Sequence, residues 1–170
     1  AITLHQLGMI HHDQGKYAEA VGLYEQSLQI EKELGDRRGV AQTLHQLGNV
    51  HYDQGHYAEA VGLYEQSLHI KEELGDRRGV AITLHQLGMI HHAQGHYAEA
   101  VGLYEQSLQI KEELGDRRGV AQTLHQLGMI QQDQGKYAEA VGLYEQSLKT
   151  FEELGAKSEQ AAVLHQLGMI

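Results

Sequence analysis

Apolar residues recur along the chain three or four positions apart, which is the spacing of an α-helix. Between residues 41 and 54, Leu44, Leu47 and Val50 fall on one side of such a helix. Between residues 57 and 74, tyrosine, alanine, valine and leucine form a second apolar stripe of helical spacing. Strand-type alternation of apolar and polar residues is absent from the sequence. The pattern therefore predicts an all-α protein, with helices over 41–54 and 57–74.

Glycine and aspartate mark the expected ends of these helices. Gly55 follows the first helix and Gly75 follows the second, where glycine often adopts a positive φ after a helix C-terminus. Asp76 then stands where an N-cap side chain would accept a hydrogen bond from the next helix. Connections of only about 2–4 residues make neighbouring helices antiparallel.

The helix pair is copied along the chain with a period of 40 residues, which fits a recent tandem duplication or a consensus design. The string LHQLG begins at Leu4 and recurs every 40 residues to Leu164. We expect a single array over 1–170, with repeats at 1–40, 41–80, 81–120 and 121–160 and a partial fifth repeat at 161–170. One helix pair cannot bury both of its apolar faces, so the repeats should stack into an α-solenoid.

Glycine also occurs inside both helices of each repeat, where it costs about 0.5–1 kcal/mol relative to alanine. Gly48 and its counterparts in the first helices therefore indicate a close approach between two helices. We expect the same of Gly62 and its counterparts in the second helices. The alternative for the second set is a tolerated surface glycine that duplication has copied.

Charge and composition exclude several classes of partner. The 170 residues include 13 Lys and Arg against 23 Asp and Glu, a net charge of −10 with histidine neutral. Binding to nucleic acid or to an anionic membrane surface requires clustered basic residues. The chain has no cysteine, which excludes disulfides and thiolate sites. No apolar run approaches the ~20 residues of a membrane span, and no signal peptide is visible, so we expect a cytoplasmic protein.

The repeat resembles the tetratricopeptide repeat. In the second repeat, the positions of that family's pattern hold Leu44, Leu47-Gly48, His51, Ala60, Tyr64 and Ser67. The 40-residue period exceeds the usual length of about 34 residues. It is similar to the longer repeats of kinesin light chains, spindle-orientation adaptors and arrays attached to prokaryotic signalling ATPases. The resemblance implies a right-handed superhelix of antiparallel helix pairs, whose first helices line a concave groove that holds a peptide or a partner's helix.

Differences between the repeats concentrate on or beside the face of the first helices opposite the leucine stripe. Exposed residues of the second helices, such as Glu25, barely change, which favours a ligand-contact surface over free drift of exposed positions. The resemblance places the varying face in the groove. We therefore predict that a protein or peptide partner is bound by His5, Met9, His12, His45, Asn49, Tyr52, His85, Met89, His92, His125, Met129 and Gln132.

A ladder of histidines at His5, His45, His85, His125 and His165 suggests other roles. Zinc usually needs four converging ligands, whereas packed helices lie about 8–10 Å apart, so we expect no metal and no cofactor. We expect solvated imidazoles that hydrogen-bond a ligand or a neighbouring glutamine. A metal-binding or pH-responsive module is the alternative. The adjacent glutamines can hold a peptide backbone, because an amide both donates and accepts; they are Gln6, Gln46, Gln86, Gln126 and Gln166.

The remaining motifs indicate structure rather than catalysis, so we expect no enzyme. The glycines follow the repeat and form no phosphate-binding loop, and no pair of carboxylates converges. Both tyrosine rows of the second helices and the serine at Ser67 should lie in the core, and the arginine pairs in the linkers between repeats should form local ion pairs. Leu167 and Ile170 have no following helix, so head-to-tail association of chains is an alternative structural role.

Overall fold

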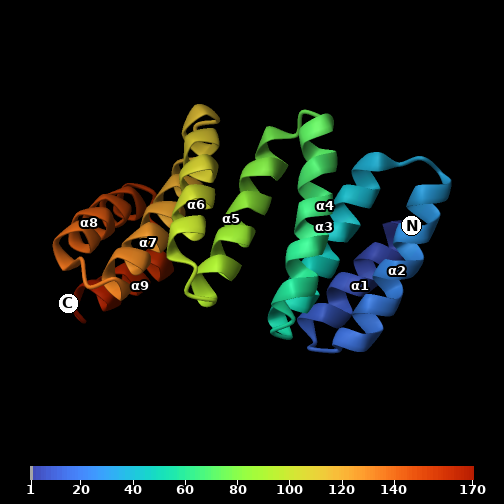
Figure 1. The fold of residues 1–170 in the computed structure, drawn as a ribbon, viewed down its shortest axis with the longest axis horizontal. Coiled ribbons are helices and arrows are strands. Elements are labelled where there is room, and N and C mark those ends of the chain that lie inside the picture. Colours follow the sequence, from blue (N-terminus) through green and yellow to red (C-terminus); the bar gives the residue numbers. More distant parts are fainter. Residues whose placement is uncertain (1) are drawn as a thin grey trace. The chain divides into compact units, whose positions relative to one another are not determined.

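The computed structural model describes residues 2–170, with the side chain of Ile2 excepted. The described residues form nine α-helices and no strand, which confirms the all-α prediction (Figure 1). The helices are α1 (Ile2–Asp13), α2 (Tyr17–Glu33), α3 (Arg37–Asp53), α4 (Tyr57–Glu73), α5 (Arg77–Ala93), α6 (Tyr97–Glu113), α7 (Arg117–Asp133), α8 (Tyr137–Glu153) and α9 (Lys157–Leu167). None of the described helices is both long and apolar enough to cross a bilayer.

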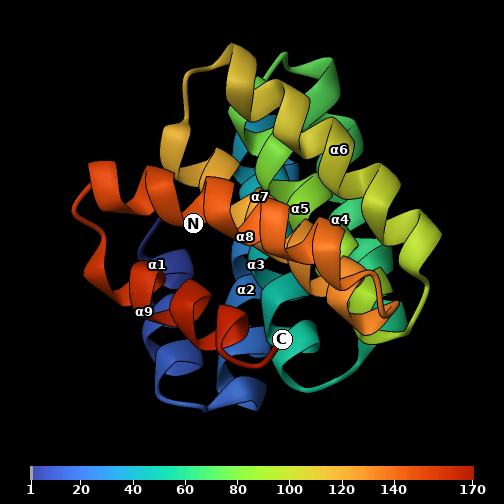
Figure 2. The ribbon, with the colours of Figure 1, turned by 90° about the vertical axis from the view of Figure 1, so that its left-hand side faces the viewer.

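The chain divides into two compact units, Ala1–Thr83 and Leu84–Ile170. In the first unit, α2 packs against both α1 and α3, and α4 packs against α3. In the second unit, α7 packs against both α6 and α8, and α9 packs against α8 (Figure 2). Each unit is thus held together by contacts between helices that follow one another in the chain, as in a solenoid.

Helix ends follow the predicted signals, with one shift. Gly55 and Gly75 have positive φ values of 76° and 67°. The side chain of Asp36 accepts a hydrogen bond from the Gly39 backbone N–H at 3.0 Å, so α3 begins at Arg37 instead of residue 41. The arginine pairs therefore lie in the first turns of helices, which corrects their expected place in linkers. The reason is that an aspartate cap starts α3, α5 and α7 four residues earlier than expected.

Glycine and tyrosine together set the spacing within each helix pair. Tyr64 is 1% exposed, and a Cβ built on Gly48 would lie only 2.7 Å from Tyr64 Cε1. The equivalent distances in the other repeats are 2.6–2.9 Å, so the predicted close approach is confirmed for the first helices. The prediction is wrong for the second helices, because no described atom outside the local helix lies within 4 Å of a Cβ built on Gly62.

The two tyrosine rows of the second helices differ in burial. The row containing Tyr64 is fully buried, as predicted, and Ser67 is also buried and donates a hydrogen bond to the Ala41 carbonyl at 2.7 Å. The row containing Tyr57 is only half-buried, and its last member, Tyr137, is 55% exposed. These tyrosines open the second helices at the edge of the helix pair, so the outer row lies at the border of the core.

Candidate functional site

The predicted groove residues all lie on the first helices α1, α3, α5 and α7. Their side chains fall into three groups according to what they contact. The ladder imidazoles lie between helices, a second group pairs with polar residues of the same unit, and the methionines remain at least partly open.

Two of the ladder imidazoles, those of His45 and His85, point into the repeat junctions, whereas His165 is exposed. His45 is 9% exposed, and the centroid of its ring lies 5.1 Å from that of Tyr64. Its Nδ1 atom lies 3.3 Å from both Lys71 Nζ and Thr83 Oγ1. His85 makes the same contacts in the second unit, with Lys111 and Thr123 at 3.3 Å. We expected solvated imidazoles; His45 is instead buried and His85 partly buried, because a buried lysine and threonine of the neighbouring helices lie against each of them.

The hydrogen-bond directions at this junction identify the charge state of His45. Lys71 Nζ donates to Thr83 Oγ1 at 2.8 Å, and Thr83 Oγ1 donates to the Gly79 carbonyl at 2.9 Å. Since the hydroxyl hydrogen is already used, His45 Nδ1 accepts from Lys71, which places the imidazole proton on Nε2. Burial, and then the Lys71 ammonium, lower the pKa of His45 to about 3. His45 therefore stays neutral in the range where a physiological histidine switch would titrate.

The junctions between α2 and α3 and between α8 and α9 have other residues at the position of Lys71. In the first repeat, Glu31 accepts from Ser27 at 2.8 Å and from Thr43 at 3.2 Å. Thr43 Oγ1 therefore accepts from His5 Nδ1 at 2.9 Å, which reverses the direction seen with Lys71. Burial lowers the pKa of His5, against the opposing effect of the Glu31 charge. The fourth repeat has Phe151 at this position.

Sequence reasoning missed this interior position. The feature that could have revealed it is a sequence difference at one position of the second helices, which are otherwise nearly constant. The residues there are Glu31, Lys71, Lys111 and Phe151. All four side chains are buried, at 2–6% exposure.

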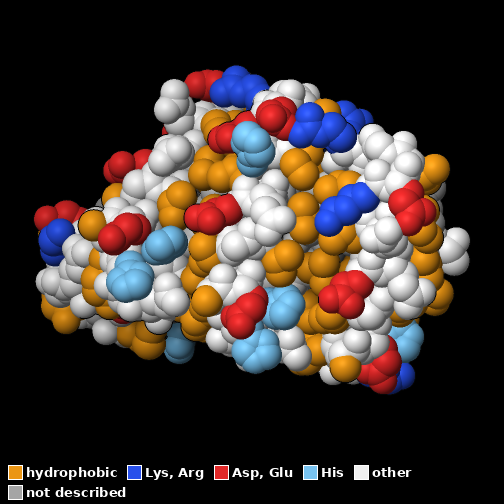
Figure 3. Space-filling model, turned by 45° about the vertical axis from the view of Figure 1, so that its right-hand side comes forward, with side chains coloured by type: hydrophobic (Ala, Val, Ile, Leu, Met, Phe, Trp, Pro, Cys, Tyr) orange, Lys and Arg blue, Asp and Glu red, His pale blue; other side chains and the backbone are white. Residues whose placement is uncertain are grey.

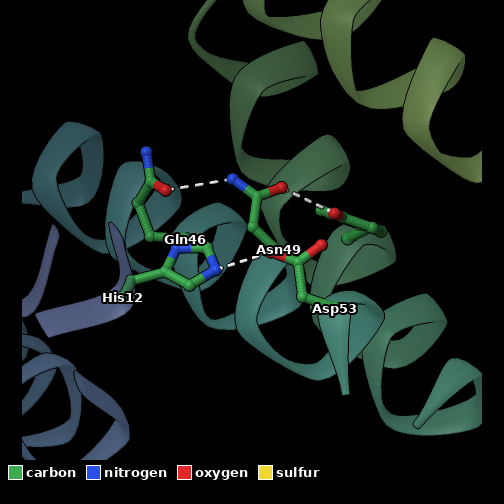
Figure 4. Close-up of polar contacts among 5 residues, drawn as sticks. His12, Gln46, Asn49 and Asp53 are labelled. Atoms are coloured by element: carbon green, nitrogen blue, oxygen red, sulfur yellow. Dashed lines mark hydrogen bonds and ion pairs between the residues drawn. The ribbon is translucent and has the colours of Figure 1, made fainter. Parts of the chain in front are cut away.

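The second group makes polar contacts within its own unit, one of which joins successive first helices (Figure 4). His12 Nε2 of α1 lies 2.7 Å from Asp53 Oδ2 of α3. Asn49 Oδ1 accepts from the hydroxyl of Tyr64 at 2.6 Å, and Asn49 Nδ2 donates to Gln46 Oε1 at 3.0 Å. Asn49 thus supplies the partner that a buried tyrosine hydroxyl needs, and its amide is largely committed within the chain.

The second unit repeats these contacts with one exchange. His92 Nε2 lies 2.7 Å from Asp133 Oδ2, and Gln132 Oε1 accepts from the hydroxyl of Tyr144 at 2.7 Å. At the remaining positions of the His–Asp pair, the sequence has Tyr52 and Ala93, so both partners are replaced together.

The methionines and a pocket form the open part of the first-helix face. Met9 is 42% exposed, whereas Met89 and Met129 are partly buried against the core. In the second unit, a pocket of about 330 Å³ lies against α5, α7, α8 and α9. It is lined by His85, Gln86, Met89, Gln122, His125, Gln126, Phe151, Glu159 and Ala162. The pocket therefore brings together three predicted residues, His85, Met89 and His125, and adds glutamines whose role the sequence only suggested.

Charged side chains form pairs rather than a patch of one sign. Arg37 is paired with Glu73, and Arg117 with Glu153, each joining the start of one first helix to the end of the next second helix. The hydrogen bond from Arg37 is the main cause that lowers the pKa of Glu73. Acidic and basic side chains are interspersed on the face drawn in Figure 3. Within the described part of the chain, no three histidine or carboxylate side chains are placed to hold a metal ion.

Comparison with known proteins agrees with this architecture. The tetratricopeptide repeat profile matches residues 1–73, 69–113 and 119–170. Comparison with curated protein sequences gives no match. Among solved structures, BtubC (BKLC) from P. vanneervenii is 19% identical with a TM-score of 0.77, over 96% of this chain and 76% of that one. A protein from Podosopora anserina, described as a kinesin light chain with nearly identical TPR-like repeats, is 25% identical with a TM-score of 0.74. The match covers 98% of this chain and 86% of that one.

A further neighbour is a Rap protein in complex with competence and sporulation factor. It is 20% identical with a TM-score of 0.84 over 94% of this chain, which spans only 45% of the length of the Rap chain. At such low identity, this likeness concerns the fold. The profile matches, by contrast, cover nearly the whole sequence. The chain belongs to the tetratricopeptide repeat family.

Proposed function

We propose that the first-helix face of this array binds a peptide or a helix of a partner protein. The observation that carries the proposal is the pocket of about 330 Å³ in the second unit, where His85, Met89 and His125 converge. A concave site with an apolar floor and a few uncommitted polar groups is the usual form of a binding site.

The predicted residues divide into contact and support. Direct contact falls to side chains that are at least partly accessible and, within the described part of the chain, have no hydrogen-bond partner on a neighbouring helix: Met9, Tyr52, Met89, His125 and Met129. Methionine suits this role, because its flexible thioether adapts to partners of different shape. The support falls to the residues that hydrogen-bond to neighbouring helices: His5, His12, His45, Asn49, His85, His92 and Gln132.

The family supports an interaction role. Tetratricopeptide arrays are generally protein-interaction scaffolds and typically are not enzymes. One Rap neighbour is bound to competence and sporulation factor, and another, of plasmid pLS20, is bound to the Phr* peptide. We infer that this chain likewise acts as a scaffold.

A pair of matched substitutions tests the binding face. Peptides selected from a random displayed library against the folded chain would be titrated against Gln86→Arg and against Gln66→Arg. Both changes add the same charge, but Gln86 lines the pocket whereas Gln66 is exposed on the second helix α4. We expect Gln86→Arg to weaken binding about tenfold or more and Gln66→Arg to leave it unchanged. Equal effects of the two changes would place the binding site elsewhere.

A second candidate function is head-to-tail self-association. Apolar side chains are exposed on α1, with Leu7 at 41% and Ile10 at 50%, and on and after α9, with Leu164 at 54% and Ile170 at 44%. Exposed apolar patches often mark interfaces. The mass from light scattering over a hundredfold range of concentration tests this candidate, and Ile10→Lys should abolish any rise. A constant mass near 19.0 kDa would rule it out.

A further inference from the structure

The pocket of the second unit has a distinctive chemistry of its own. Its apolar wall is formed by Met89, Phe151 and Ala162. Its polar wall is formed by amides of α5 and α7 and by the imidazole of His125. The volume of about 330 Å³ is at the lower end of the roughly 300–1,000 Å³ usual for ligand pockets. It therefore suits one or two side chains of a bound peptide rather than a large compound.

The charged groups near the pocket already have partners. Glu159 is paired with Arg118 at 2.7 Å, and Lys111 Nζ donates to Thr123 at 2.8 Å. A charged ligand group would thus be desolvated without a free counter-charge, which is costly. The pocket should therefore select an uncharged group.

The polar wall has unused hydrogen-bonding capacity. His125 Nε2 is buried and has no partner among the described residues. Gln86, Gln122 and Gln126 make no side-chain hydrogen bond within the described part of the chain. Each amide can donate and accept at once, and neutral histidine can do either according to its tautomer. The best complement is a neutral group that also donates and accepts.

We propose that this pocket accepts a carboxamide side chain, an asparagine or glutamine of the bound peptide. The carboxamide pairs with the glutamine amides and His125 Nε2, while its methylene stem lies against Met89 and Phe151. This assignment rests on the proposed function, because it names the residue class that the same face recognises. It gives the second unit a specificity that a backbone-binding glutamine row alone would lack.

The first unit provides an internal contrast. It has the same histidine, glutamine and methionine positions, as His5, Gln6, Met9, Gln42, His45 and Gln46. However, Lys71 and Gly79 replace the residues equivalent to Phe151 and Glu159. His45 already contacts Lys71 at 3.3 Å, so its imidazole has a partner. The carboxamide preference should therefore be confined to the second unit.

The experiment uses five N-acetyl amino acid N-methylamides, those of glutamine, asparagine, leucine, glutamate and lysine. Each is titrated into the ¹⁵N-labelled full chain, and the side-chain NH₂ signals are followed by NMR. We expect the glutamine and asparagine compounds to shift the signals of Gln86, Gln122 and Gln126. We expect the other three compounds to bind about tenfold more weakly. Equal or stronger binding of the leucine, glutamate or lysine compound, or no shift with any compound, would overturn the proposal.

Matched variants separate this proposal from the proposed function. Gln126→Met should abolish the carboxamide preference, whereas Gln66→Met on the exposed face of the second helix α4 should leave it unchanged, with helicity monitored by circular dichroism. A preference that survives Gln126→Met would also overturn the assignment. If selected peptides lose affinity with Gln86→Arg but show no carboxamide preference, the binding face stands and only the pocket assignment fails. If they are insensitive to Gln86→Arg, the binding face itself is wrong.

Discussion

The junction between α6 and α7 and the junction between α8 and α9 belong to the same unit but fill their interiors with opposite chemistry. In the first, Lys111 is 5% exposed, donates to Thr123 at 2.8 Å and lies 3.3 Å from His85 Nδ1. In the second, the equivalent residues are Phe151 and Val163, which are 2% and 0% exposed and belong to one apolar cluster.

The comparison shows that the lysine and its threonine acceptor are exchanged together at this junction. Exchange of lysine for phenylalanine is matched by exchange of threonine for valine, so no buried hydroxyl loses its donor. The histidine is the member that did not change, and His125 Nε2 is left buried without a partner among the described residues. A buried unpaired group costs about 1–3 kcal/mol, which ligand binding at the pocket could relieve.

The largest effect should come from putting the lysine of one junction into the other. Phe151→Lys would bury an ammonium beside Val163, whose side chain offers no acceptor. We expect a loss of about 3–5 kcal/mol in the free energy of unfolding, measured with urea. Phe151→Lys with Val163→Thr restores the acceptor and should recover about 1 kcal/mol or more. A single-variant loss below about 1 kcal/mol would show that the apolar junction tolerates charge.

The reverse exchange should stabilise the polar junction. Lys111→Phe with Thr123→Val copies the set of the α8–α9 junction and removes a buried charge, which commonly gains about 1–4 kcal/mol. Thr123→Val alone should instead cost about 1–3 kcal/mol, because Lys111 loses its acceptor. Urea unfolding of the single and double variants checks both signs. If the free-energy changes of Lys111→Phe and Thr123→Val simply add in the double variant, the two residues are not energetically coupled.

The two polar junctions should also make stability depend on pH. Burial lowers the pKa of Lys71 and of Lys111 from 10.5 to about 8. Between pH 8 and 10.5 the unfolded chain then binds more protons than the folded chain, so stability rises with pH through this window. We expect a gain of roughly 1–3 kcal/mol between pH 7.5 and 9.5, from about 1.4 kcal/mol per pKa unit. Urea unfolding of Lys71→Met with Lys111→Met should show a flat profile; an unchanged slope would assign the effect to other groups.

The solenoid could be predicted from the sequence because its contacts are local and periodic. Glycine inside the first helices also predicted a close approach at Gly48, which Tyr64 makes, although the same argument failed for Gly62, where the structure shows open space. The direction in which the His45 side chain points could not be predicted in the same way. Its position borders both the leucine stripe and the open face, and the buried partner Lys71 decides between them. The pocket likewise depends on Phe151 and Glu159, which lie far from its glutamines in sequence.

The smallest effect should come from the tyrosine hydroxyls, where the first two repeats differ. Tyr64 donates to Asn49, whereas the hydroxyl of Tyr24 is buried beneath the Met9 position and has no partner among the described residues. Met9→Asn should supply a hydrogen-bond partner for the Tyr24 hydroxyl and raise the free energy of unfolding by about 0.5–1.5 kcal/mol. Little burial is lost in exchange, because Met9 is exposed. Asn49→Met, the matched exchange, should cost about 1–3 kcal/mol by leaving the hydroxyl of Tyr64 unpaired. Urea unfolding measures both changes in the free energy of unfolding. Opposite signs would show that the tyrosine hydroxyl needs its asparagine partner. A loss in both variants would mean that this partner contributes nothing beyond local packing.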